Sequence, residues 1–147
     1  IDAIRELWRN DVASFDGRYV KFDQVECRPW PVRRDIPLFI GGSSRAAIRR
    51  AALRGDGYFP FVFPGQDPEV ELPRLIARVR AETAAAGRDP DAMEFTAGGA
   101  RTVEAAKRYA DFGIHRLTVA IRARTIPEMR DEVARLGDEL VGPTADL

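Results

Sequence analysis

A pair of glycines followed by a pair of serines lies where a short apolar strand is predicted to give way to a helix. Glycines let a backbone approach an anion closely, and the first turn of a helix offers free N–H groups and a positive dipole end. Serine hydroxyls can add further donors. This pattern is typical of a phosphate-binding loop, although a tight turn with a serine cap has the same composition. The residues of this candidate site are Ile40, Gly41, Gly42, Ser43 and Ser44.

The next predicted strand, residues 58–63, is rich in aromatic and proline residues. In a parallel sheet it lies beside the glycine-containing strand, so its aromatic and proline surfaces could form a floor for a flat ring at the same edge. Large apolar residues are more often buried, however, and the run taken alone favours a core strand.

Three arginines follow the last two predicted strands. Arg101 comes after the glycine pair 98–99, and Arg122 and Arg124 come after residues 117–121. Ligands of parallel sheets bind at the carboxyl ends of the strands, so these side chains could meet an anionic substrate; solvated loop charges are the alternative. His115 precedes its strand and is therefore expected at the opposite, structural end.

The composition excludes several functions. The 147 residues carry 23 basic and 23 acidic side chains, and this zero net charge argues against a nucleic acid or an anionic membrane as partner. One cysteine and one histidine provide no metal cluster. Because we find neither a membrane-spanning apolar run nor a signal-peptide pattern, we expect a cytoplasmic protein.

The hydrophobic pattern predicts four units of strand plus helix. Continuous apolar strands indicate a parallel sheet covered by helices, which is either an open doubly wound sheet or part of a (β/α) barrel. The helix that begins at Asp67 contains Pro73 and is expected to restart there. The predicted strands are residues 38–40, 58–63, 93–97 and 117–121, and the predicted helices are 44–54, 67–86, 102–112 and 125–140.

Residues 1–35 do not follow this alternation of strands and helices. An apolar helical stripe starts at Ile1, and the turn dipeptide Asp16-Gly17 between apolar segments predicts a hairpin. We expect residues 1–35 to form a helix plus a hairpin-like insertion segment before residues 36–147. The whole is expected to be a single, incomplete domain.

These segments together resemble luciferase-like monooxygenases, and the match extends over nearly the whole chain. The motifs that carry the resemblance are Ile4-Arg5-Glu6-Leu7-Trp8, Ser14-Phe15-Asp16-Gly17-Arg18-Tyr19, Arg28-Pro29-Trp30-Pro31, residues 36–44, Gly55-Asp56-Gly57-Tyr58 and Gly87-Arg88-Asp89-Pro90. The branch it is most similar to is the actinobacterial oxidoreductases that use the deazaflavin coenzyme F-420; other branches use FMN. The resemblance implies an α/β fold in which residues 36–147 are the C-terminal half of a TIM barrel, with four strands and four helices.

The resemblance also implies roles for individual residues. The segment from Ile40 to Ser44 would hold the cofactor phosphate, and Pro60 with Phe61 would border the cofactor ring. The catalytic acid and base residues belong to the barrel strands that precede this chain, so none is assigned here. Tyr58 stands where tryptophan is more usual in the family.

The implied function is hydride transfer or oxygen activation on a small organic substrate. The alternatives are an inactive half-barrel that binds a phosphate-containing ligand or serves as an assembly module, and an unrelated phosphate-binding barrel enzyme. The strands near Leu38 and Leu117 would be unpaired sheet edges. We therefore expect the isolated chain to lack redox activity and to pair with the missing N-terminal half or with a second copy.

Overall fold

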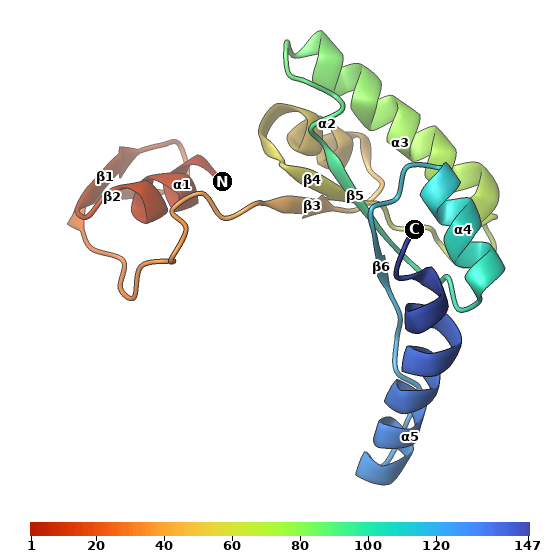
Figure 1. The fold of residues 1–147 in the computed structure, drawn as a ribbon. Helices are drawn as coiled ribbons and strands as arrows, with labels where there is room; N and C mark the ends of the chain where they lie inside the picture. Colours follow the sequence, from red (N-terminus) through yellow and green to blue (C-terminus); the bar gives the residue numbers. More distant parts are fainter. The chain divides into compact units, whose positions relative to one another are not determined.

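The computed structural model describes residues 1–147, which divide into two compact units, Ile1–Leu38 and Phe39–Leu147 (Figure 1). None of the helices is both long enough and apolar enough to cross a membrane. The elements of the first unit are α1 (Asp2–Arg9), β1 (Ala13–Asp16) and β2 (Lys21–Val25).

The first unit contains the predicted hairpin. Strands β1 and β2 pair antiparallel, and the Gly17 N–H donates to the Val20 carbonyl at 3.0 Å to close the turn. Phe15 and Phe22 stack across the pair with their ring centroids 5.9 Å apart. The turn dipeptide thus specified this hairpin locally.

The second unit is a four-stranded parallel sheet in the order β3-β4-β5-β6, so β3 and β6 are its edges, as predicted. Its strands are β3 (Phe39–Gly41), β4 (Gly57–Phe59), β5 (Glu94–Gly98) and β6 (Arg116–Thr118). Its helices are α2 (Arg45–Arg54), α3 (Pro68–Ala85), α4 (Val103–Asp111) and α5 (Ile126–Leu136), followed by a π-helix η1 (Gly137–Val141) and a 3-10 turn η2 (Gly142–Thr144).

Two predictions about strand ends and one about a helix were wrong. The strands predicted at 58–63 and 117–121 end earlier, at Phe59 and Thr118. Pro60 has no N–H to continue the ladder, which accounts for the end of β4. Helix α3 continues through Pro73 without a break, because its neighbours Leu72 and Leu75 are buried in the core and this burial offsets the lost hydrogen bond.

The helices pack on one face of the sheet. Tyr58 and Phe95, at the centre of that face, are fully buried against α2 and α3. Because side chains alternate along a strand, the neighbouring residues point to the opposite face, which we call the open face. It carries Phe39, Gly41, Gly57, Phe59, Glu94, Thr96, Gly98, Arg116 and Thr118.

Helix starts follow the predicted caps. The Ser44 and Thr102 hydroxyls accept from the N–H groups of Ala47 and Ala105, each at 3.2 Å. Thr125 begins α5 with a complete capping box. These local bonds fix where α2, α4 and α5 begin relative to the carboxyl ends of the strands.

The far end of α2 is capped from a distance. The Arg88 guanidinium donates to the carbonyls of Ala52 and Gly55, both at 2.7 Å, and to that of Ala51 at 3.3 Å. The Ala52 and Gly55 carbonyls lie in the last turn of the helix and just beyond it, where acceptors lack partners within the helix. The Ala51 carbonyl also accepts from the Gly55 N–H at 2.8 Å. The motif that begins at Gly87 therefore has a structural role in this unit.

Candidate functional site

The glycine loop, residues 41–44, connects β3 to α2. Gly42 has a φ of +103°, and a Cβ at this position would lie 3.5 Å from the Ala47 Cβ. Residues with side chains rarely adopt this φ. The loop therefore depends on glycine for its conformation as well as for access to its backbone.

The neighbouring strand holds the glycine loop in place. The Gly42 N–H donates to the Phe59 carbonyl at 3.1 Å, and the Tyr58 hydroxyl donates to the Gly42 carbonyl at 2.7 Å. Burial raises the pKa of the Tyr58 hydroxyl. Tyr58 therefore remains a neutral donor beneath the loop.

Ser43 and Ser44 use their hydroxyls differently. The Ser43 Oγ accepts from the Phe61 N–H at 2.9 Å and donates to the carbonyl of the same residue. The Ser44 Oγ accepts from Ala47, and its own proton has no acceptor among the described contacts. Only Ser44 thus has a hydroxyl proton available for a ligand.

The start of α2 suits an anion. The N–H groups of Arg45 and Ala46 occupy its first two positions and have no acceptor within the helix. The first turn contains no acidic residue, and neither Arg45 nor Arg49 forms an ion pair in the structure. Together with the Ser44 hydroxyl, these groups fit a phosphate.

The residues after β4 separate into buried and exposed side chains. Pro60 is buried, and Val62 packs against the core. Phe61 and Phe63 are 55% and 56% exposed, with their rings edge to face and the centroids 5.0 Å apart. Phe61 therefore presents its ring to solvent, whereas Pro60 does not.

The side chain of Ile40 also packs against the core, so only its backbone groups can contribute to a site at the glycine loop. At the other end of the strands, the His115 Nδ1 accepts from the Phe95 N–H at 3.0 Å. That bond joins β5 to the residue before β6, which is a structural role. No group of histidine, cysteine or acidic residues is arranged to hold a metal ion.

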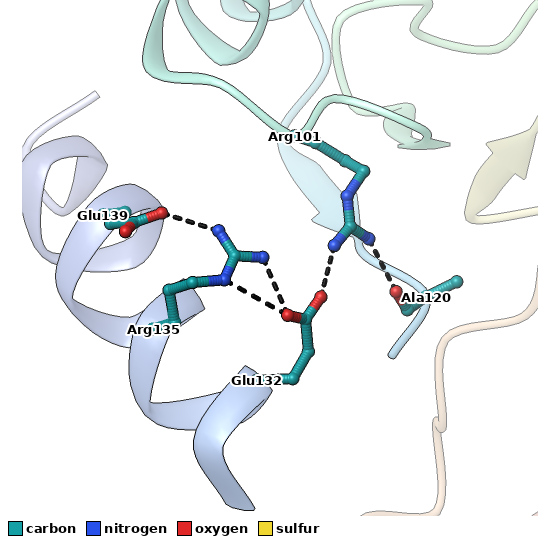
Figure 2. A network of polar contacts seen from close by, with 5 residues as sticks. All are labelled: Arg101, Ala120, Glu132, Arg135 and Glu139. Carbon is teal, nitrogen blue, oxygen red and sulfur yellow. Dashed lines mark hydrogen bonds and ion pairs between the residues drawn. The ribbon is translucent and has the colours of Figure 1, made fainter. Parts of the chain in front are cut away.

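Arg101 is bound within a polar network (Figure 2). Its guanidinium donates to the Ala120 carbonyl at 2.7 Å and forms an ion pair with Glu132 on α5. Arg135 binds the same carboxylate at 2.8 Å and Glu139 at 2.6 Å. Arg101 thus ties the loop after β5 to α5, and a substrate contact for it stays a prediction.

The two other predicted arginines are exposed. Arg122 lines a shallow cleft of about 290 Å³ together with a second arginine and three acidic residues, namely Arg135, Glu128, Asp131 and Glu132. The Arg124 N–H donates to the Glu128 carboxylate at 2.8 Å. Three carboxylates in this cleft reduce its attraction for an anion, and the structure does not place either arginine against the glycine loop.

We expect the network to make stability depend on pH. The hydrogen bond from Arg135, with a further one from Arg101, lowers the pKa of Glu132 despite the opposing effect of burial. A depressed folded-state pKa gives stability that is present above the unfolded pKa of about 4.3 and is lost as the pH falls through the lower folded value. The melting temperatures of the wild type and of Glu132→Gln, measured by thermal denaturation, should differ by a constant amount from about pH 5.5 to 8. The two melting temperatures should converge below about pH 4. An equal difference at all pH values would show that the charge of Glu132 does not contribute.

Two features of the sheet gave no signal in the sequence. The Tyr58 hydroxyl supports the glycine loop, although its position in an apolar run indicated only core packing. Thr96, on the open face, is 4% exposed, and its hydroxyl has no hydrogen-bond partner in the structure. The hydrogen bond of Tyr58 and the burial of Thr96 both depend on which strands become neighbours in the sheet, and the linear pattern does not show this.

Solved structures identify the fold. A monooxygenase from Streptomyces bottropensis superimposes with a TM-score of 0.65 at 14% identity, covering 96% of this chain and 58% of that one. The coenzyme F-420-dependent tetrahydromethanopterin reductase of Methanopyrus kandleri gives a TM-score of 0.56 at 16% identity, covering 70% of this chain and 30% of that one. The α/β fold, with its four-stranded parallel sheet, matches part of a TIM barrel.

Sequence comparisons then identify the family. Residues 1–135 match the luciferase-like monooxygenase family, and the chain belongs to it. An uncharacterized protein of Mycobacterium tuberculosis is 35% identical over 123 residues, which cover 83% of this chain and 41% of that protein.

Two other relatives are described by the cofactors they use. An F-420-dependent glucose-6-phosphate dehydrogenase of Mycolicibacterium smegmatis is 32% identical over 91 residues, covering 62% of this chain and 26% of the enzyme. An FMNH2-dependent dimethylsulfone monooxygenase of Pseudomonas putida is 40% identical over 60 residues, covering 40% of this chain and 16% of the enzyme. The chain therefore spans less than half the length of these three relatives.

Proposed function

We propose that this chain is the C-terminal half of a TIM-barrel oxidoreductase and that its glycine loop holds the phosphate of a flavin-type cofactor. The observation that carries this proposal is the start of α2, where the Arg45 and Ala46 N–H groups and the Ser44 hydroxyl are free beside Gly42. Such a cofactor supplies hydride transfer or oxygen activation when it is bound. The residues of this chain bind its phosphate, and the exposed ring of Phe61 borders its flat part.

Coenzyme F-420 is the proposed cofactor, with FMN as the alternative. The ranking follows the branch that the sequence motifs resemble. Relatives of both kinds are similar to this chain: the dehydrogenase of M. smegmatis uses F-420 and the monooxygenase of P. putida uses FMNH2. We propose a small organic substrate, with Arg122 and Arg124 available to its anionic part. The open face supports a partner, either the preceding half of the barrel or a second copy of this chain.

The test is the replacement of Gly42 by valine in protein expressed with any in-frame sequence that precedes Ile1. Valine requires a different φ and places bulk beside Ala47, so the loop can no longer bring its backbone to a phosphate. We expect the affinity for F-420, measured by fluorescence titration, to fall at least roughly ten-fold, about 1.4 kcal/mol. A parallel titration with FMN identifies the preferred cofactor.

Gly87→Val is the matched control. Gly87 also has a positive φ, +71°, but it follows α3 and has no atom near its missing Cβ. The Gly87→Val protein should lose stability to a similar extent as the Gly42→Val protein and keep its cofactor affinity. Equal affinity in the Gly42→Val protein would place the phosphate elsewhere. Failure of the wild type to bind either cofactor would favour the second candidate, an assembly module without redox activity.

A further inference from the structure

We propose that Ser43 is a positioning residue whose hydroxyl fastens the aromatic segment after β4 to the glycine loop, and that the Phe61 and Phe63 rings held by this contact receive the flat apolar part of the ligand. This inference rests on the proposed function. It gives Ser43 a task that differs from the phosphate contact expected from the family resemblance.

The hydroxyl of Ser43 is already fully engaged. A serine hydroxyl has one proton to donate, and here that proton goes to the Phe61 carbonyl. The same oxygen accepts from the Phe61 N–H at 2.9 Å. Donating to a phosphate would therefore require Ser43 to release Phe61, whereas Ser44 can donate without any such loss.

The contact extends the pairing of β3 with β4 beyond the strands themselves. The last backbone bond between the two segments runs from the Gly42 N–H to the Phe59 carbonyl. After Pro60 has ended the ladder, the Ser43 side chain supplies both bonds that a further backbone residue would otherwise supply to Phe61. Phe61 is thereby held at a fixed distance from the glycine loop.

The aromatic segment has the composition of a binding surface for a flat apolar group. Residues 57–66 contain no charged side chain. Val62 packs inward, so Phe61 and Phe63 both project outward, each more than half exposed. Two exposed aromatic rings next to an anion-binding loop suit a ligand that carries a planar ring and a phosphate.

The first test measures the contact itself, by hydrogen exchange at the Phe61 amide observed by NMR. Ser43→Ala should speed that exchange about three- to ten-fold, since it removes the acceptor. Ser43→Thr keeps a hydroxyl and should restore protection, and Ser44→Ala, the matched control, should leave the Phe61 amide unchanged. Unchanged exchange in Ser43→Ala overturns the positioning role.

The second test separates the ring from the phosphate by titrating riboflavin, which has no phosphate, and inorganic phosphate alone. Ser43→Ala and Phe63→Ala should each weaken riboflavin binding about three- to ten-fold and leave phosphate affinity within about two-fold. The reverse pattern in Ser43→Ala, with phosphate weakened and riboflavin unchanged, identifies Ser43 as a phosphate donor and overturns the proposal. If the wild type binds neither probe, the proposed function and the ring contact both fail, and the exchange experiment still decides the role of Ser43.

Discussion

Replacing Gly57 with alanine is expected to destabilise the second unit by about 1–3 kcal/mol, the usual cost of forcing an extra methyl group into a packed site. The Phe39 ring lies directly over Gly57, and a Cβ there would be 2.3 Å from the Cε1 atom of that ring and 2.4 Å from Cδ1. The Arg116 guanidinium lies 4.9 Å from the centroid of this ring, so a shift of the ring would also disturb that contact. Arg116 is itself paired with Glu94 at 3.2 Å.

Urea denaturation followed by circular dichroism measures this effect. Gly137→Ala makes the same chemical change where nothing lies near the missing Cβ, and it should be neutral or stabilise by up to about 1 kcal/mol. In a Phe39→Ala background the Gly57→Ala penalty should largely disappear, since the two positions are in contact. Additive effects of the two substitutions would show that the Phe39 ring does not cause the penalty.

Replacing Arg88 with alanine is expected to cost about 2 kcal/mol, because three carbonyl acceptors at the end of α2 lose a charged donor that is partly shielded from water. The positive charge of Arg88 also interacts favourably with the negative end of the helix dipole. The loss should be visible as a lower midpoint in thermal and urea denaturation, with no change in the affinity of the glycine loop for phosphate.

Two control variants separate the contributions. Arg88→Lys keeps the charge but not the planar fork that reaches several carbonyls, so it should recover less than half of the lost stability. Arg50→Ala removes an exposed arginine without an ion pair in the structure and should change stability by less than about 0.5 kcal/mol. Full recovery in Arg88→Lys would mean that the charge at the helix end, and not the hydrogen-bond geometry, accounts for the effect.

Features that depend on neighbours in the chain could be predicted from the sequence. The caps at Ser44, Thr102 and Thr125 and the hairpin turn at Gly17 are specified by a few adjacent residues, and all are present. The sheet order with its two edges follows from right-handed connections between consecutive parallel strands. Turn chemistry and short connections act before any distant contact forms.

Features that join distant segments could not be predicted in this way. Ser43 and Phe61 are 18 residues apart, and Arg101 and Glu132 are 31 residues apart. Their residue types gave no sign of these contacts, because nothing in a linear pattern shows which distant polar groups will bond with one another. The strand ends were missed for a related reason, since the apolar run 58–63 continues into a loop that still packs partly against the core.

The side-chain bulk of the open face is unequal along the strands. At the amino ends it carries Phe39, Glu94 and Arg116, and the Phe39 ring covers Gly57. At the carboxyl ends β4 and β6 carry Phe59 and Thr118, whereas β3 and β5 end on Gly41 and Gly98, which have no side chain. Any layer that covers this face therefore meets a filled end and an end where two strands leave space. A second layer can therefore approach the sheet backbone more closely at the carboxyl ends of β3 and β5, beside the glycine loop, than at the amino ends, which the Phe39 ring fills.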